Sequence, residues 1–303
     1  MVANNSGALV EVKNLSKVFS RGRNEVRAVS DLSFVAKPGR VTGFLGPNGA
    51  GKTTTLRCLL DLVAPSNGEA TFNGVTYANL TDPAKQVGVS LGFTGIHPGR
   101  SAYNHLSVFA TAAGIDSKRI DEVLELVGLT SAKNRKAGSF STGMKQRLSL
   151  ATALLGDPQV LILDEPVNGL DPEGIVEVRQ LLRNLAAQGK TVLLSSHVLS
   201  EVQQTVDDVV IIAKGKKVRE CTLQELIEET RPVIHVVTPT PEKFNSFTGG
   251  QVTTAGDRVA LYDTSLKAVG NFAFVNQIEL HELSEELLDL EQVFLELTGG
   301  ANV

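Results

Sequence analysis

The most informative stretch of the sequence is Gly46-Pro47-Asn48-Gly49-Ala50-Gly51-Lys52-Thr53-Thr54, which matches the pattern G-x-x-x-x-G-K-T. It follows a strand-like run at residues 41–45 and leads into a helix-like run at residues 54–60. A strand, a glycine-rich loop and a helix in this order form the context of a phosphate-binding loop. The alternative is a plain glycine-rich turn before a helix, but the spacing, the Lys-Thr pair and the flanking runs all favour phosphate binding.

The residue types in this loop suit a triphosphate. Glycines allow successive backbone N–H groups to face one concavity, and the following helix adds partial positive charge at its N-terminus. We therefore expect the whole segment 46–54 to bind the phosphates of ATP, with Lys52 as the cation that reaches the β- and γ-phosphates. The hydroxyl of Thr53 is predicted to be a ligand of Mg²⁺.

The bulk composition is that of an ordinary globular protein of 303 residues with one large domain or two. A net charge of −4 gives no reason to expect nucleic-acid binding. The sequence has only two cysteines, Cys58 and Cys221, which indicates a reducing compartment rather than a disulfide framework. Neither has a His or Cys partner at metal-ligand spacing, so both are expected to be packing residues. The N-terminal residues show no signal-peptide pattern, and no apolar run approaches the ~20 residues that span a bilayer. If the protein serves a membrane, we expect the spanning parts on another chain.

Two carboxylates follow the continuous apolar run at residues 160–163. A run without alternation is typical of a parallel strand buried on both faces, and the carboxyl end of such a strand faces a ligand crevice. Asp164 is predicted to hold Mg²⁺ and Glu165 to polarise an attacking water; the alternative is a pair of solvated acids. His197 follows another buried strand at residues 191–196, where a catalytic role and a surface or capping role are equally supported.

A second helix start lies at Phe140-Ser141-Thr142-Gly143-Met144. Ser141 is predicted to be the N-cap, and a helix N-terminus is also a possible anion site, although most such caps are purely structural. Phe19 lies in a polar stretch, residues 17–23, that we expect to be a turn between two strands. It is equally consistent with stacking on a purine base and with the core of a hairpin.

The chain has two predicted parts. Helical periodicity begins near residue 95 and continues to about residue 155. The composition shifts after Cys221, and Arg231-Pro232 begins a segment that reads as a small α+β unit. Within it we expect strands at 233–237 and 278–281, a hairpin at 252–262, and helices at 242–247, 266–272 and 290–297.

Taken in order, these motifs resemble the ATP-binding subunit of an ABC transporter over residues 8–220, with the helical subdomain at about 95–155. Residues 46–53 correspond to the Walker A loop, 140–144 to the signature, 161–164 to Walker B, 168–171 to the D-loop and His197 to the switch histidine. The resemblance implies an α/β P-loop ATPase fold with a mixed sheet core, an antiparallel β subdomain and a helical subdomain. Residues 221–303 form a C-terminal accessory α+β domain similar to that of ABC-2-type exporters, and residues 97–106 are similar to drug- and bacitracin-resistance members.

The resemblance also implies the chemistry. Phe19 falls where the family stacks adenine, and Ser141, Gly143 and Asp171 are expected to bind nucleotide across a dimer. Glu165, His197 and Lys52 are the expected catalytic residues for ATP hydrolysis with Mg²⁺. The expected partners are integral-membrane permease subunits on separate chains and a second ATP-binding subunit, a homodimer by preference. The expected location is the cytoplasmic side of the cell membrane, as a peripheral protein that drives export by ATP-dependent dimer closure.

The sequence departs from the family pattern at three positions. Gly92, followed by Phe93, stands where the family usually has Gln, so no side-chain oxygen is offered to Mg²⁺ or water there. Thr142 replaces Gly and Met144 replaces Gln in the signature, whereas Ser141 and Gly143 are retained. A binding module that dimerises but turns over poorly is therefore one alternative. A second is a soluble ABC ATPase of translation or DNA repair, which the single phosphate loop and the absence of a long coiled coil disfavour. A small-molecule kinase would leave the Ser141 motif without a role.

Overall fold

The computed structural model describes residues 8–21, 24–92, 95–229, 233–286 and 290–299. The chain divides into two compact units, of which the first comprises Met1–Leu223 with Leu297–Val303 and the second Gln224–Glu296. Residues 1–7, Phe93 and Arg231-Pro232, on which some of the expectations above rest, lie outside the described residues.

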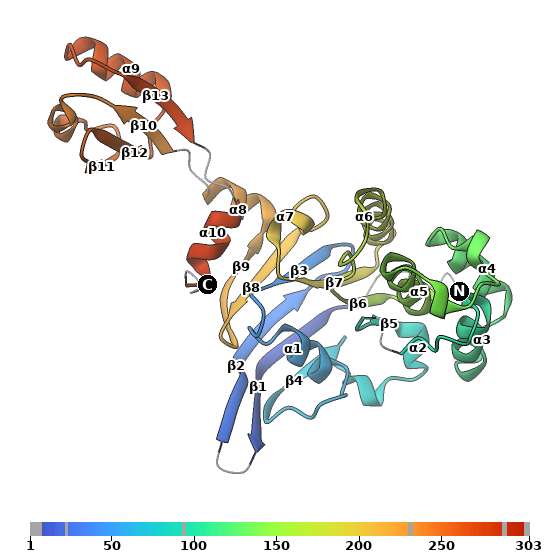
Figure 1. Ribbon diagram of the computed structural model, residues 1–303. Coiled ribbons are helices and arrows are strands. Elements are labelled where there is room, and N and C mark those ends of the chain that lie inside the picture. The colour runs from blue at the N-terminus through green and yellow to red at the C-terminus, as the bar shows by residue number, and fades with distance from the viewer. Residues whose placement is uncertain (1–7, 22–23, 93–94, 230–232, 287–289, 300–303) are drawn as a thin grey trace. The chain divides into compact units, whose positions relative to one another are not determined.

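A six-stranded sheet forms the centre of the first unit (Figure 1). Its spatial order is β5 (Val87–Ser90), β6 (Val160–Asp164), β7 (Thr191–Ser196), β3 (Val41–Leu45), β8 (Asp208–Ala213) and β9 (Lys216–Thr222). The pairs from β5 to β8 are parallel, and β8 pairs with β9 antiparallel. Strands β3 and β7 are buried along their whole length, as expected for apolar strands covered on both faces. The predicted mixed sheet is therefore confirmed.

A smaller antiparallel sheet has the order β2 (Asn24–Ala36), β1 (Val10–Arg21) and β4 (Asn67–Phe72). The expected polar turn at residues 17–23 is wrong for residues 17–21, which continue strand β1. Phe19 pairs with Val26 and Ser20 with Glu25, so the ladder of the long hairpin satisfies the backbone despite the polar side chains. Polar composition alone did not reveal this extension because an exposed strand can carry polar residues on both faces.

One hydrophobic core joins the two sheets through helix α1 (Lys52–Leu59). Leu56 and Leu59 of α1 are fully buried in this core. Phe34 of β2 and Phe44 of β3 stack in it with ring centroids 5.0 Å apart. Burying apolar side chains of this size contributes about 1.5–3 kcal/mol each, so α1 is held firmly at the end of β3.

The remaining helices of the first unit are α2 (Pro83–Gln86), α3 (Ala102–Ala112), α4 (Lys118–Leu126), α5 (Thr142–Leu154), α6 (Pro172–Ala187) and α7 (Leu199–Val202), with 3₁₀ turns η1 (Tyr77–Asn79), η2 (Thr130–Ala132) and η3 (Ala137–Ser139). Helices α3, α4 and α5 gather beside the β5 side of the sheet (Figure 1). The amphipathic helices expected near residues 102–113 and 120–128 are confirmed, and Ile120, Val123 and Leu124 form the buried face of α4.

The second unit is a four-stranded antiparallel sheet with helices on its apolar face. Its elements are α8 (Leu223–Glu229, with Leu223 in the first unit), β10 (Val233–Val237), the 3₁₀ helix η4 (Pro241–Ser246), β11 (Gln251–Ala255), β12 (Arg258–Tyr262), α9 (Leu266–Val275), β13 (Glu282–Glu286) and α10 (Leu290–Leu297, the last residue again in the first unit). The strand expected at 278–281 is wrong, because Ile278 is buried in the core and the strand begins at Glu282. Three glutamates in β13 hid this strand from a reading of hydrophobicity. None of the helices in the described ranges is long and apolar enough to cross a membrane.

Candidate functional site

Strand β3 leads directly into the glycine-rich loop, whose path leaves no room for side chains at two positions. A Cβ atom on Gly46 would lie 2.5 Å from the carbonyl oxygen of Ile212. A Cβ atom on Gly51 would lie 2.4 Å from the carbonyl oxygen of Ala28, and Gly51 also has a φ of +106°. Glycine is therefore required at both positions, and the backbone can wrap closely around a ligand.

Lys52 occupies the first position of α1, and its side chain folds over the loop. Its Nζ atom donates to the carbonyl oxygen of Gly46 at 2.5 Å and to that of Pro47 at 3.2 Å, and the residue is only 6% exposed. Burial lowers the pKa of Lys52, while the nearby carboxylates of Glu165 and Asp164 raise it. The ammonium group thus lies inside the concavity of the loop, close to both predicted acids.

The other residues of the loop surround this position. Asn48 and Gly49 are exposed, Pro47 and Thr54 are half-buried, and Ala50 is buried. The loop closes with a backbone hydrogen bond of 3.1 Å from the N–H of Ala50 to the carbonyl of Pro47. Its tip is therefore open to solvent while its base is fixed by the core.

Thr53 and Asp164 meet across the loop and the end of β6. The Oγ1 atom of Thr53 donates to Oδ2 of Asp164 at 2.9 Å, and the hydroxyl of Ser195 donates to Oδ1 of the same carboxylate. Ser195 lies directly beside Asp164 in the parallel ladder of β6 and β7. A hydroxyl and a carboxylate held together provide the hard oxygen ligands that Mg²⁺ prefers, so these two residues fit the predicted metal.

Glu165 adopts a backbone conformation that is unusual for its residue type. Its φ is +49°, in the left-handed region that disfavours residues with a side chain by about 1–2 kcal/mol. Its N–H donates to the carbonyl and the hydroxyl of Ser195 at 3.2 and 3.1 Å, and its carbonyl accepts from Nε2 of Gln146 at 3.1 Å. Contacts on both sides of the residue thus hold a conformation that it would not adopt alone.

The carboxylate of Glu165 is held between two side chains. Its Oε1 atom lies 3.0 Å from Nδ1 of His197, and Nδ2 of Asn168 donates to Oε2 at 3.0 Å. Thr53, Asp164, Glu165 and Asn168 line one pocket of about 330 Å³. The structure therefore brings together residues predicted from three separate motifs: Lys52, Thr53, Asp164, Glu165 and His197.

Gly92 lines the same pocket. It has a φ of +82°, its Cβ position is open, and its carbonyl accepts from the Ser149 hydroxyl at 2.9 Å. Ser149 also shares a 2.8 Å hydrogen bond with Ser90 at the end of β5. The backbone of Gly92 is thus anchored to helix α5.

Ser141, Gly143 and Asp171 lie apart from the phosphate loop, whereas Thr142 of the signature also lines the pocket of Thr53 and Asp164. Ser141 caps α5 by accepting from the N–H of Met144 at 3.2 Å, and Asp171 caps α6 by accepting from the N–H of Gly174 at 3.2 Å. Both line a pocket of about 660 Å³ with Gly143, and Lys52 and Thr53 do not line it. The predicted N-cap is confirmed, while the nucleotide-binding role of these residues stays a prediction.

Phe19 lies on β1 with 43% of its surface exposed, and Nζ of Lys17 is 4.9 Å from its ring centroid. It is not part of the buried core, so the interpretation as a hairpin core aromatic is wrong. An exposed ring is available for stacking, which stays a prediction.

Sequence reasoning missed Ser195 and Gln146. Both are polar and nearly fully buried, at 0% and 4% exposure. For Ser195 the available signal was a hydroxyl after the apolar run 192–194, which points to burial but not to the partner, because buried polar groups are normally hydrogen-bonded. Gln146 lies among other polar residues of α5 and gave no such signal.

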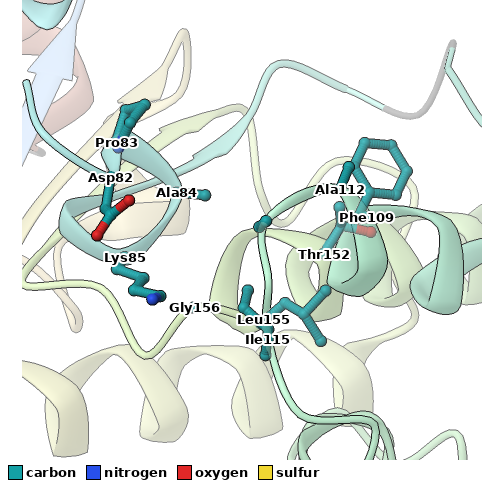
Figure 2. A pocket seen from close by; sticks show the side chains of 11 residues that line it. Asp82, Pro83, Ala84, Lys85, Phe109, Ala112, Ile115, Thr152, Leu155 and Gly156 are labelled. Carbon is teal, nitrogen blue, oxygen red and sulfur yellow. The ribbon is translucent and has the colours of Figure 1, made fainter.

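A further pocket of about 370 Å³ lies away from these residues (Figure 2). Asp82, Pro83 and Lys85 line one side of it, and Phe109 of α3 and Leu155 after α5 line the other. Phe109 is 43% exposed, so the pocket is open to solvent on the α3 side, and its lining combines apolar side chains with the charged Asp82 and Lys85.

A glycine-rich loop with a buried lysine, a hydroxyl–carboxylate pair and an adjacent carboxylate define the class of P-loop nucleotide hydrolases. The comparisons narrow this class. The family model described as "ABC transporter" matches residues 29–168. The chain is 41% identical to the bacitracin transport ATP-binding protein BcrA of Bacillus licheniformis, over 74% of this chain and 72% of the relative. It is 33% identical to the Nod factor export ATP-binding protein I of Burkholderia orbicola, over 97% and 98%.

A solved structure of an ATP-binding cassette has a similar fold. The dimeric post-hydrolysis state of the ATP-binding cassette MJ0796 with ADP and Pi matches with a TM-score of 0.63 and 25% identity, over 71% of this chain and 98% of that one. The chain belongs to the family of ABC transporter ATP-binding proteins. It is an ABC-type ATPase whose relatives include the ATP-binding subunits of exporters.

Proposed function

We propose that the loop at residues 46–54 binds ATP and that Glu165 is the general base for its hydrolysis. The observation that supports this most strongly is the convergence of Lys52, Thr53, Asp164 and Glu165 at the ends of β3 and β6. Lys52 would neutralise phosphate charge, and Thr53 and Asp164 would hold Mg²⁺, which supplies further charge neutralisation when bound.

Glu165 and His197 would have different roles in the attack of water on the γ-phosphate. The Glu165 carboxylate is fixed by Asn168 and His197, so it is oriented to take a proton from water. His197 keeps that carboxylate in place and stabilises charge on the γ-phosphate. Phosphoryl transfer needs positioning and electrostatics more than covalent catalysis, and these residues provide both.

We further propose that two such subunits close around two ATP molecules. Ser141, Gly143 and Asp171 form a surface apart from the phosphate loop, and a helix N-terminus at Ser141 favours an anion. A phosphate bound to the loop of a second subunit fits this surface, and Phe19 would stack on the adenine. The relative MJ0796 is dimeric in its solved structure.

The proposed partners in transport are integral-membrane permease subunits, with this chain peripheral on the cytoplasmic side and export as the direction. The name of the Nod factor relative supports export, and the name of the bacitracin relative supports transport. The open pocket beside Phe109 is the proposed surface for a permease segment, because exposed apolar side chains such as Phe109 mark partner contacts, and Asp82 and Lys85 add charged groups at its other side (Figure 2). Residues 8–220, which lie within the first unit, would act as the nucleotide-binding domain, and residues 221–303, which include the whole second unit, as an accessory domain.

The test is Glu165→Gln in the full chain. We expect ATP affinity within about threefold of wild type, hydrolysis lowered by at least about 100-fold, and an ATP-dependent dimer in light scattering. Glu125→Gln, an exposed position on α4, is the matched control and should behave as wild type. Phosphate release at the wild-type rate in Glu165→Gln would exclude Glu165 as the base.

A second candidate function is an ATP-dependent dimerisation module with slow turnover. It is favoured by Gly92, which lines the pocket without offering a side-chain oxygen. Steady-state ATPase activity of the assembled complex separates the two candidates, because a module of this kind binds ATP and dimerises with little phosphate release.

A further inference from the structure

We propose that Gln146 is a positioning residue for Glu165, through which helix α5 holds the catalytic carboxylate in place. The inference rests on the proposed role of Glu165 as general base. It goes further because it assigns a role in hydrolysis to a residue of helix α5 that is not among the proposed catalytic residues.

The first step is the contact itself. Nε2 of Gln146 donates to the carbonyl oxygen of Glu165 at 3.1 Å, and Gln146 is 4% exposed. Water therefore has little access to replace this donor. The same carbonyl also accepts from the N–H of Asn168 at 3.2 Å, so Gln146 is one of two donors that hold it, and the loss of one such hydrogen bond costs about 0.5–1.5 kcal/mol. The amide of Gln146 thus has an energetic effect on the backbone of Glu165.

The second step is the conformation that this contact maintains. Glu165 has a φ of +49°, and its peptide groups are held by Ser195 on the amino side and by Gln146 together with the N–H of Asn168 on the carbonyl side. Without the Gln146 amide, only the N–H of Asn168 remains on the carbonyl side, which weakens the restraint and allows the residue to relax toward an ordinary backbone conformation. The side chain would then swing away from His197 and Asn168, and small misplacements of a catalytic group reduce rates strongly.

The third step is the helix that carries Gln146. The same helix presents Ser149, three residues later, whose hydroxyl donates to the carbonyl of Gly92 at 2.9 Å. Residues three apart lie on one face of a helix, so α5 supports the pocket at two points. Ser141 caps this helix at its start, about 7.5 Å along the axis from Gln146 at 1.5 Å per residue.

The consequence is a physical link between two surfaces of one subunit. A force on the N-terminus of α5, where the proposed function places a partner's nucleotide, is transmitted by a rigid helix to the backbone of Glu165. Binding of the partner's nucleotide at Ser141 would thereby change the position of Glu165 in this subunit's own pocket.

The test compares wild type, Gln146→Met, Glu165→Gln and the double variant in the full chain with Mg·ATP. Met keeps the volume and removes the donor. We expect Gln146→Met to lower kcat at least about tenfold with ATP Kd within about threefold. When Glu165→Gln is already present, adding Gln146→Met should change the single-turnover rate of phosphate release by less than about twofold. The reason is that Gln146 affects the rate only by positioning the Glu165 carboxylate, which this variant lacks.

Gln180→Met is the matched control, since Gln180 is an exposed glutamine on α6 bonded to Asn184, and it should show wild-type kinetics. The proposal is overturned by a wild-type kcat in Gln146→Met, by effects that multiply with those of Glu165→Gln, or by an equal loss of ATP binding. If Gln146→Met does not fold, Gln146→Asn keeps the amide but is too short to reach, and the same criteria apply. A fully active Glu165→Gln variant would instead refute the proposed function.

Discussion

Nδ1 of His197 lies 3.0 Å from Oε1 of Glu165, although the two residues are 32 positions apart. The parallel pairing of β6 and β7 produces this contact, because the carboxyl ends of both strands reach the same edge of the sheet. Of the two interpretations of His197 left open by the sequence, the geometry favours the catalytic one.

His197→Ala should therefore lower kcat by about 100-fold while ATP Kd changes little, since general acid–base and orienting groups contribute on this scale. The measurement is steady-state phosphate release with varied ATP. His281→Ala is the control, because His281 also pairs with a glutamate, Glu279, at 3.1 Å but lies in the second unit. Equal activities of the two variants would remove His197 from the mechanism.

Lys52→Ala should abolish tight nucleotide binding, because among the described residues Lys52 is the only lysine or arginine that donates to the loop carbonyls of Gly46 and Pro47. We expect at least a tenfold rise in Kd for a fluorescent ATP analogue, at about 1.4 kcal/mol per tenfold change. Exposed Lys37, replaced in the same way, provides the comparison. Unchanged affinity in Lys52→Ala would contradict the assignment of the loop.

Thr53→Val should weaken the response to Mg²⁺ more than the binding of ATP itself. The substitution keeps the shape and removes the hydroxyl that contacts Asp164. We expect the Mg²⁺ concentration for half-maximal hydrolysis to rise at least about tenfold, because one oxygen ligand is lost. The measurement is a Mg²⁺ titration of ATPase activity at saturating ATP, and an unshifted midpoint would exclude Thr53 as a ligand.

Gly92→Gln tests whether the missing amide oxygen limits turnover. The Cβ position is open, but the φ of +82° disfavours a side chain by about 1–2 kcal/mol. Gly74→Gln is a close control, with a φ of +80° and an equally open Cβ position away from the pocket. We expect both variants to lose similar thermal stability and only Gly92→Gln to raise hydrolysis or change its Mg²⁺ dependence. Identical kinetics would show that another group supplies this oxygen.

The stability of the first unit should depend on pH through His105. This side chain is 3% exposed on α3, and burial, followed by the charge of Arg100, lowers its pKa below 6.5. Below that pH the unfolded chain binds a proton that the folded chain does not. The free energy of unfolding should therefore fall as the pH drops below 6.5, with a slope of up to about 1.4 kcal/mol per pH unit.

His105→Gln should reduce this pH dependence because Gln does not titrate. Urea unfolding at about pH 7.5 and about pH 5.5 measures the difference between the two proteins. A pH dependence that is the same in the variant and in wild type would assign the effect to other groups.

The sequence was sufficient for features that depend on residue type at fixed spacing. The loop at 46–54 requires small residues and a lysine, and the strand ahead of Asp164 requires an unbroken apolar run, so both were visible. Features that depend on a partner far away in the sequence could not be predicted. Ser195 and Gln146 act on Glu165 from 30 and 19 residues away, and nothing local in the chain indicates those contacts.

Dependence on a distant partner also explains why two strands were predicted wrongly. Residues 17–21 are a strand because they pair with β2, and the glutamate-rich β13 is a strand because it pairs with β10. Pairing satisfies backbone groups whatever the side chains are, so a reading of polarity misplaced both elements.

The register of β6 against β7 has one more consequence. Asp164 is level with Ser195, and side chains alternate between the two faces of a strand. A single residue inserted between Thr191 and Ser195 would exchange the serine for a leucine beside the carboxylate, without altering any motif. Activity therefore depends on the number of residues in the strand as well as on the residue types in the motifs. Insertions in β7 should reduce activity far more than insertions in exposed connections.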